Sequence, residues 1–427
     1  MIPRALHRFA VLTAVATLGL VGVGGLVTSH GVGMAVPDWP NTYGYNMFFF
    51  PVSRWVGGIF YEHSHRLFAS GVGLFTTILA LWLYGKSAQP LLRWGGLFLA
   101  LLGLLTVLIV PRHWADGVVS GVTGIIAFSA SWFWPRCEPS PKWLRRLGVL
   151  AFFGVVFQGV LGGLRVVLFK DQLGIFHATL AQLFFVLICL LAVFTSPFWQ
   201  RRNWKATGQK REAGEADMAT VSPGEPQLHG VVGRLAPLFL ITTFLILCQL
   251  ILGATMRHQH AGLAIPDFPL AYGKLWPAVD PGSVQIYNQH RIEVTAANPI
   301  TAFQIELQMV HRILAGLILV AVASCAFAAR NRSGKKASLS KPALIWLAFV
   351  LIQGLLGAAT IWSNKAADIA TLHVLTGAIT LALGAILTSV AYRDRKSVLN
   401  YKQLLAFTPS GALGGFEPRP STAGQTR

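Results

Sequence analysis

Acidic, imidazole and guanidinium side chains are gathered where a long apolar run of the sequence begins. Residues 61–66 read YEHSHR and lead directly into the apolar run 67–84. Glu62 and His65 are three residues apart, so they would share one face of a helix. An imidazole can bind a metal ion, and a carboxylate can accept a proton. This segment is therefore the first place in the chain where chemistry is expected.

Three further histidines occupy comparable places in the sequence. His311 and Arg312 open another long apolar run, and His177 and His373 lie just inside the starts of two more. Neutral imidazole is a common metal ligand, and haem iron accepts two axial ligands. Whether the four histidines can act together depends on the segments that position them.

The composition predicts a membrane protein. Of the 427 residues, 54% are hydrophobic and only 12% are charged, which is too apolar for a soluble globular protein. Runs of about 17–22 apolar residues recur, the length that crosses a bilayer. We therefore expect an all-α polytopic membrane protein, since a β-barrel would show short alternating segments. The ten predicted spans are 9–27, 64–84, 94–110, 117–134, 147–164, 174–195, 235–255, 307–329, 343–362 and 369–391.

Membrane topology explains the net charge of +19, so the charge does not indicate nucleic-acid binding. With a cytoplasmic N-terminus, 25 of the 35 Lys and Arg residues fall on the cytoplasmic side, 8 on the external side and 2 within spans. This distribution follows the positive-inside rule and places both termini in the cytoplasm. It also favours contact with anionic lipid.

The first apolar run is expected to remain as a span. Its internal counterpart, 235–255, cannot be cleaved, so we do not interpret the first run as a signal peptide. No Arg- and Ser-rich transit segment precedes it, which favours a bacterial plasma membrane over an organelle.

The sequence contains one pattern twice. Residues 33–44 read GMAVPDWPNTYG and residues 262–273 read GLAIPDFPLAYG, with seven of twelve positions identical. Their Pro, Asp and Gly residues predict rigid, turn-rich external loops. Each loop leads to a span that opens with His-Arg, and a Gln-Gly motif, at 158–162 or 353–357, precedes the next histidine. Small residues in these motifs would let helices approach closely.

The repeat divides the chain into two four-helix halves. The N-terminal half is longer by two spans, which we interpret as an inserted hairpin. The segment after the first half is charged and rich in Gly, Pro and Ser, which is typical of a linker. We assign 1–84 and 135–196 to the N-terminal half, 85–134 to the inserted transmembrane hairpin, 197–233 to a cytoplasmic linker, 234–393 to the C-terminal half and 394–427 to a flexible cytoplasmic tail.

All four repeated histidines fall at the external ends of spans that run from outside to inside. His65 and His177 belong to the second and fourth helices of the first half, and His311 and His373 take the same places in the second. Two helices of one bundle can present imidazoles to a flat macrocycle between them. We interpret the two pairs as axial ligands of two haem irons. The alternative is that each histidine hydrogen-bonds to a neighbouring helix.

The residues beside the two His-Arg pairs differ between the halves. Arg66 and Arg312 could pair with haem propionates, or else extend to the membrane interface. Glu62 is matched by Gln308, so a carboxylate accompanies only one predicted haem. This asymmetry indicates that the halves have different tasks, with Glu62 as the catalytic candidate. The alternative is an exposed carboxylate at the membrane boundary.

The other polar residues are interpreted as structural. His63 and His258 are expected in external segments, facing solvent. Asp38 and Asp267 occur in both loops and are expected to bind loop backbone amides. The four cysteines lack CxxC spacing, so neither a disulfide framework nor a zinc site is predicted.

The combined motifs resemble those of haem A synthases over nearly all of residues 1–393, apart from the inserted hairpin. They are EHSHR at 62–66, QGVLGG at 158–163, MVHR at 309–312 and the paired DWP and DFP loops. That family oxidises the C8 methyl of haem O to a formyl group, which gives haem A for terminal oxidases, and holds haem b as a cofactor.

The resemblance implies a role for each candidate residue. His65 and His177 would ligate the iron of the substrate haem O, and His311 and His373 the iron of haem b. Glu62 matches the family's acidic residue one helical turn before the ligand. Some members carry a cysteine pair in the first external loop, but residues 28–62 contain none, so the resemblance does not extend to a thiol relay.

The resemblance therefore implies a haem-dependent oxidoreductase of cytochrome oxidase assembly. Its expected partners are haem O, the lipid bilayer, haem O synthase, an electron donor and a second copy of the chain. Because two imidazoles fill both axial positions, either one ligand leaves or electrons are removed through the macrocycle, with water supplying oxygen and Glu62 accepting a proton. The residues alone leave two other functions open: a quinol-linked dihaem electron-transfer protein of the b type, or a haem transporter or chaperone.

Overall fold

The computed structural model describes residues 2–168, 170–200, 235–290, 299–333 and 339–407. Ten helices within these residues are long and apolar enough to cross a membrane, which confirms the predicted all-α polytopic class. They are α1 (Arg4–Ser29), α2 (Gly57–Leu83), α3 (Gln89–Ile109), α4 (Trp114–Phe133), α5 (Lys142–Leu168), α6 (Asp171–Thr195), α9 (Ala236–His258), α11 (Ala302–Ser333), α12 (Ser340–Trp362) and α13 (Ala367–Phe407).

Shorter elements cap or connect these helices. The short helix α10 (Pro281–Gln289) begins at the N-cap Asp280, whose carboxylate accepts the Ser283 N–H at 3.0 Å. The remaining elements are the 3-10 turns η1 (Met47–Phe49), η2 (Val52–Arg54), η3 (Gly85–Ala88), η4 (Pro111–His113) and η5 (Ala261–Leu263).

Several helices begin earlier than the apolar runs predict. The helix α2 begins at Gly57 and not at 64, and α11 begins at Ala302 and not at 307. A hydropathy window stops at the first polar residues, but a helix continues where its polar side chains are buried and paired. As a result, the cluster around Glu62 and His65 lies inside a helix and not at its mouth.

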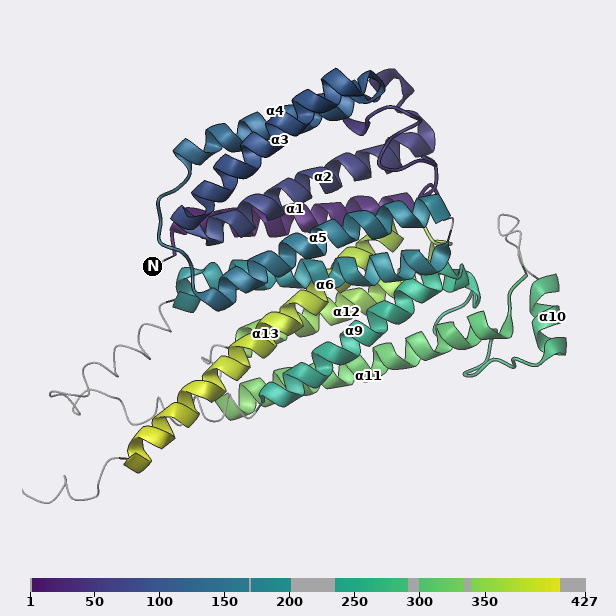
Figure 1. The fold of residues 1–427 in the computed structure, drawn as a ribbon. Coiled ribbons are helices and arrows are strands. Elements are labelled where there is room, and N and C mark those ends of the chain that lie inside the picture. Colours follow the sequence, from purple (N-terminus) through teal and green to yellow (C-terminus); the bar gives the residue numbers. More distant parts are fainter. Residues whose placement is uncertain (1, 169, 201–234, 291–298, 334–338, 408–427) are drawn as a thin grey trace, which may run out of the picture.

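Eight of the long helices form two sets of four. The N-terminal bundle consists of α1, α2, α5 and α6, in which α1 and α5 each pack against both α2 and α6. The C-terminal bundle consists of α9, α11, α12 and α13, in which α9 and α12 each pack against both α11 and α13. The bundles meet where α1 and α6 pack on α13 and where α6 packs on α9 (Figure 1). Helices of both bundles therefore line the space between them.

The helices α3 and α4 form a hairpin at one side of the N-terminal bundle (Figure 1). Glycines bring their backbones into contact: a Cβ added to Gly103 would lie 2.3 Å from the Gly121 nitrogen, and one added to Gly124 would lie 2.3 Å from the Ala100 nitrogen. Such small-residue contacts hold helices together in a membrane. The outward side chains of the hairpin, such as Phe98, are exposed and apolar.

The two repeated loops, 33–44 and 262–273, are called the PDxP loops after the PDWP and PDFP that they contain. They are built alike and are not helical through their central turns, as predicted. The carboxylate of Asp38 accepts the N–H groups of Tyr43 and Gly44 at 2.8 and 2.7 Å. The carboxylate of Asp267 accepts the N–H groups of the corresponding residues at 2.7 and 2.9 Å. The prediction that both aspartates bind loop amides is confirmed.

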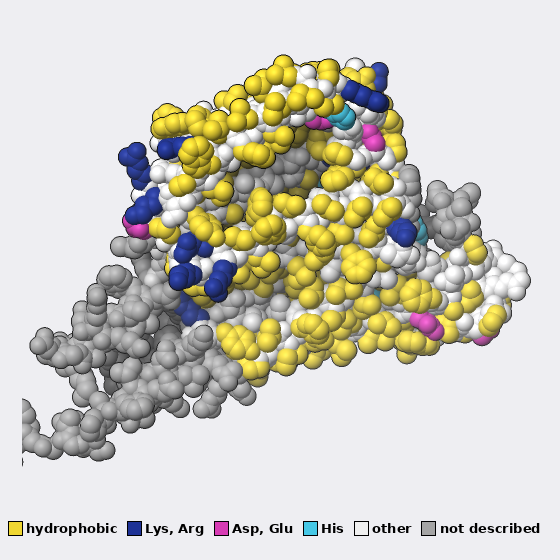
Figure 2. All heavy atoms as spheres, viewed as in Figure 1, with side chains coloured by type: hydrophobic (Ala, Val, Ile, Leu, Met, Phe, Trp, Pro, Cys, Tyr) yellow, Lys and Arg dark blue, Asp and Glu magenta, His cyan; other side chains and the backbone are white. Residues whose placement is uncertain are grey.

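The surface suits a bilayer. Figure 2 shows hydrophobic side chains over the middle of the visible face, with Lys and Arg side chains towards its ends. The predicted linker, 197–233, and the predicted tail, 394–427, are described only in part. Most of the predicted linker 197–233 lies outside the described residues, as does 408–427. The first part of the predicted tail is helical, because α13 continues to Phe407.

Candidate functional site

A cavity of about 1380 Å³ extends across both bundles. A typical small-molecule site has roughly 300–1,000 Å³, so this cavity has room for an unusually large ligand or for more than one. Every predicted site residue lines it, namely Glu62, His65, Arg66, His177, His311, Arg312 and His373. The structure thus brings together residues that lie more than 300 positions apart in the chain.

Each of the four histidines faces a glycine on the preceding helix of its bundle. A Cβ added to any of these glycines would lie within 3.3 Å of the imidazole ring, closer than most Cβ contacts in proteins. The absence of a side chain therefore makes room for each ring. The pairs are Gly24 with His65, Gly162 with His177, Gly253 with His311 and Gly357 with His373, at 3.1, 3.2, 3.3 and 3.3 Å.

Three of the imidazoles carry a buried nitrogen that has no hydrogen-bond partner among the described residues. These nitrogens are the Nδ1 atoms of His177, His311 and His373. A buried polar atom without a partner costs about 1–3 kcal/mol. Hydrogen-bond links between helices do not account for these three atoms, although the other ring nitrogen of His373 lies 3.5 Å from the Gln353 amide of α12. Imidazoles in glycine-lined space with unsatisfied nitrogens fit the axial ligation of haem iron.

Glutamine side chains fix the backbone near the imidazoles. Gln158 of α5 donates to the His177 carbonyl oxygen at 3.1 Å, and Gln249 of α9 donates to the His311 carbonyl oxygen at 2.9 Å. These two hydrogen bonds end on backbone carbonyl groups, so they fix the positions of the helices and not the orientation of the rings. In the C-terminal bundle, Gln353 of α12 also lies 3.5 Å from the Nε2 atom of His373, a contact that a bound iron would replace.

Glu62 is buried within α2, with only 4% of its surface exposed, so the alternative of an exposed boundary carboxylate is wrong. Its Oε2 accepts the Val36 N–H at 2.9 Å, and its Oε1 accepts a hydrogen bond from Arg66 at 2.8 Å. The carboxylate therefore joins the first PDxP loop to the helix that carries His65.

Gln308 of α11 has the same task in the other bundle. Its Oε1 accepts the Ile265 N–H at 2.8 Å, and Ile265 holds the loop position that corresponds to Val36. Its amide nitrogen also lies 3.3 Å from the Ile265 carbonyl oxygen. The two positions build the same loop contact and differ in charge.

The guanidinium groups of Arg66 and Arg312 hold loop carbonyl groups. Arg66 donates to the carbonyl oxygens of Asp38 and Asn41 at 2.6 and 2.9 Å, and Arg312 donates to that of Asp267 at 2.7 Å. Arg66 is only 9% exposed, so extension to the membrane interface is wrong for this residue. Pairing with haem propionates stays a prediction for both arginines.

The prediction that His63 and His258 face solvent is wrong. His63 is fully buried, and its Nδ1 is hydrogen-bonded to the Thr42 hydroxyl at 3.1 Å because the first loop folds back over α2. His258 is 7% exposed and contacts Gly174 of α6, because α9 continues beyond the apolar run to its last residue. Their burial depends on tertiary contacts that local polarity does not indicate.

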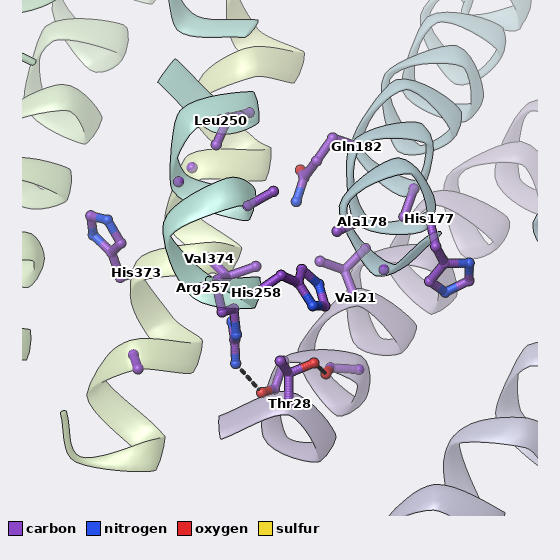
Figure 3. A pocket seen from close by; sticks show the side chains of 18 of the residues that line it. Val21, Thr28, His177, Ala178, Gln182, Leu250, Arg257, His258, His373 and Val374 are labelled. Carbon is purple, nitrogen blue, oxygen red and sulfur yellow. Dashed lines mark hydrogen bonds between the residues drawn. The ribbon is translucent and has the colours of Figure 1, made fainter. Parts of the chain in front are cut away.

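Sequence reasoning missed Arg165 and Arg257, which also line the cavity. Arg257 of α9 donates to the Gly25 carbonyl oxygen and to the Ser29 hydroxyl of α1 at 2.5 and 2.6 Å. Figure 3 shows Arg257 and His258 between His177 of one bundle and His373 of the other. Both arginines follow the ends of the predicted spans 147–164 and 235–255, so the sequence suggests loop residues, and no local motif marks them.

Comparison with known proteins gives a consistent match. Residues 112–385 match the model of the COX15-CtaA family, cytochrome oxidase assembly protein. The heme A synthase of Symbiobacterium thermophilum is 30% identical over 182 residues, which cover 42% of this chain and 53% of that protein. The heme A synthase of Anaplasma marginale (strain Florida) is 31% identical over 136 residues, which cover 32% of this chain and 34% of that protein.

The aligned part of the chain thus spans about half the length of one relative and a third of the other. The family match includes His177, His311 and His373 but begins after the segment 62–66. The role of His65 therefore depends on its counterpart His311 in the internal repeat, and that of Glu62 on its difference from Gln308. Since well over half of the chain matches the family model, this multi-pass membrane protein belongs to the COX15-CtaA family of cytochrome oxidase assembly proteins.

Proposed function

We propose that this chain is a haem A synthase, which oxidises the C8 methyl of haem O to a formyl group and so makes haem A for terminal oxidases. One observation carries the proposal: the four repeated imidazoles line a single cavity, each opposite a glycine, and a carboxylate stands beside only one of them. Membership of the family and two relatives named heme A synthase support it.

In this proposal, His65 and His177 hold the iron of haem O in the N-terminal bundle. His311 and His373 hold the iron of haem b in the C-terminal bundle. The bound haem supplies the redox chemistry, and the protein supplies position and electrostatics. Buried nitrogen atoms on three of the rings and the glycine opposite each ring support ligation by these histidines, and the carboxylate present in the N-terminal bundle alone supports the division between the two haems.

Glu62 is the proposed catalytic residue because it lines the cavity three residues before His65. Oxidation of a methyl group releases protons, and a buried carboxylate within reach can accept one. Arg66 keeps this carboxylate in one orientation through the 2.8 Å hydrogen bond. Gln308, which lacks an ionisable group, leaves the C-terminal bundle to electron transfer.

Both PDxP loops contribute residues to the cavity wall, Trp39 from the first and Phe268 from the second. Arg66 and Arg312 bind them to α2 and α11, which would keep water from the macrocycles. We place these loops and the haem sites near the external face of a bacterial plasma membrane, with both termini in the cytoplasm. The distribution of Lys and Arg along the chain supports this orientation. Haem O synthase and an electron donor would be its working partners.

Pigment analysis tests the function directly. The chain is expressed in a host that makes haem O but no haem A, and the membranes are extracted. The proposal predicts a formyl haem that is absent from cells with empty vector. If haem O remains unchanged and only haem b accompanies the purified protein, the chain is an electron-transfer or haem-carrying protein instead.

A further inference from the structure

The charges on the cavity wall are strongly unbalanced. Among the described residues that line it, Glu62 is the one acidic side chain, and it is already paired with Arg66. The remaining charged residues of the wall are all basic: Arg165, Arg257, Arg312 and Lys365. Enclosing so many like charges is unfavourable, and a bound anion would relieve it.

Arg165 and Arg257 lie close together although they belong to different bundles. Arg257 donates to Gly25, the neighbour of the glycine that faces His65, and Arg165 lies three residues after Gly162, which faces His177. The guanidinium group of Arg165 also reaches the first loop, where a Cβ added to Gly33 would lie 3.1 Å from it. The two arginines therefore form a cationic centre beside the pair His65 and His177.

This cationic centre has no counterpart at the equivalent positions of the internal repeat. Arg165 lies seven residues after Gln158, and Thr360 lies seven residues after Gln353. Arg257 lies four residues after Gly253, and its counterpart four residues after Gly24 is Thr28.

Both threonines line the cavity, and each returns its hydroxyl hydrogen bond to its own helix, at 3.0 Å for Thr28 and 2.8 Å for Thr360. The two guanidinium groups of the cationic centre are therefore replaced by two hydroxyl groups at the positions that the internal repeat relates to them.

We infer that Arg165 and Arg257 bind the carboxylates of the tetrapyrrole held in the N-terminal bundle, in place of Arg66, whose guanidinium group is already bound to loop carbonyl groups and to Glu62. This inference depends on the proposed function, because it takes the ligand of that bundle to be a haem. Guanidinium groups bind carboxylates through paired charge-assisted hydrogen bonds, and a haem carries two carboxylates. Arg257 also binds the end of α1, so the ligand's carboxylates would join the two bundles.

A thermodynamic cycle tests the assignment: the arginine side chains and the ligand carboxylates are removed separately and together, and the affinities are compared. The purified full chain, with its C-terminal haem bound, is titrated with hemin and with hemin dimethyl ester while the Soret absorbance is followed. Esterification removes the ligand's negative charges and leaves its ring unchanged. Wild-type protein should bind hemin roughly tenfold or more tightly than the ester, the range of a charge-assisted hydrogen bond. His65→Ala should abolish binding of both probes at this site.

The variants Arg165→Gln and Arg257→Gln should each lower the ratio of the two affinities severalfold, and the double variant should bring it close to one. Arg165→Lys, which keeps the charge, should retain part of the preference for hemin. Lys365→Gln is the matched control, since it removes another basic residue of the wall and should leave the ratio unchanged.

The inference is overturned if the wild type does not prefer hemin. It is also overturned if the Gln variants keep the wild-type ratio, including the case in which both probes bind equally more weakly. A chain that prefers hemin but makes no formyl haem would refute the proposed function and leave the carboxylate site in place.

Discussion

The N-terminal and C-terminal bundles use the same contacts to hold their loops but carry different charges at one position. Glu62 accepts the Val36 N–H at 2.9 Å, and Gln308 accepts the Ile265 N–H at 2.8 Å. An amide can therefore do the structural work of this position. The comparison indicates that the negative charge of Glu62 is not needed to build the loop and is available for chemistry.

The bundles also differ in how they fix the helix that carries the first histidine. Gln249 of α9 donates to the His311 carbonyl oxygen, but the corresponding position of α1 is Leu20, which cannot donate a hydrogen bond. The C-terminal site is thus held by an additional polar contact. A fixed site suits a resident cofactor, and a less constrained one suits a substrate that must leave after reaction.

The largest expected effect separates the two haem sites. His311→Ala should remove haem b from the purified protein, because the iron loses an axial ligand. His65→Ala should retain haem b and lose formyl product. Haemochrome spectra of the purified variants measure both pigments. Equal loss of both pigments in each variant would contradict the division of tasks between the bundles.

Filling the space opposite one imidazole should empty one site only. Gly24→Leu places a side chain against His65, where even a Cβ would lie 3.1 Å from the ring. Gly253→Leu does the same to His311 in the other bundle. We expect the first variant to lose haem O binding and keep haem b, and the second to lose haem b. Pigment content that is unchanged in both would show that the glycines do not shape the ligand sites.

Removing the loop arginines should have a smaller effect that differs between the bundles. Arg66→Gln leaves the buried Glu62 carboxylate without its cation, which costs about 3–5 kcal/mol where a buried pair is broken. Arg312→Gln breaks no ion pair: it removes hydrogen bonds to carbonyl groups and the contact of Arg312 with the Phe268 ring, so about 1–3 kcal/mol is expected.

Thermal unfolding in detergent should therefore show the larger loss of stability for Arg66→Gln. In the background of Glu62→Gln, the additional cost of Arg66→Gln should fall towards that of Arg312→Gln. If the cost stays the same, the ion pair is not what makes the N-terminal loop more sensitive.

The smallest effect is expected for Gln249→Leu, which copies the residue of the N-terminal bundle into the C-terminal one. Loss of one hydrogen bond should destabilise the protein by about 0.5–1.5 kcal/mol and weaken retention of haem b. Haem transfer to apomyoglobin measures that retention as a rate. A rate equal to that of the wild type would show that the Gln249 hydrogen bond does not cause the difference between the two sites.

The sequence predicts the features that depend on local pattern. Apolar length identifies the ten spans, and the repeated Asp of each loop predicts its bonds to backbone amides. The repeat also selects the four histidines, all of which line one cavity. Apolar length places the helix starts less well, because the polar first turns of α2 are stabilised by loop contacts.

The remaining features depend on contacts between distant segments. Arg257 and Gly25 are 232 positions apart, and no property of either segment indicates that they meet. His63 is buried by a loop that folds back over it, so its polarity alone suggests a surface residue. The cationic centre of Arg165 and Arg257 likewise exists only once the bundles are packed together.

The central claim is that the two bundles share a scaffold and that the charge of Glu62 makes one of them catalytic. The most direct measurement compares Glu62→Gln with the wild type for both formyl haem production and haem content. Because Gln308 already fills the equivalent position, the variant should fold and keep both pigments, while product formation falls by about 10²–10⁴-fold, the range of general acid–base catalysis. Wild-type product formation by a fully loaded Glu62→Gln protein would contradict the claim.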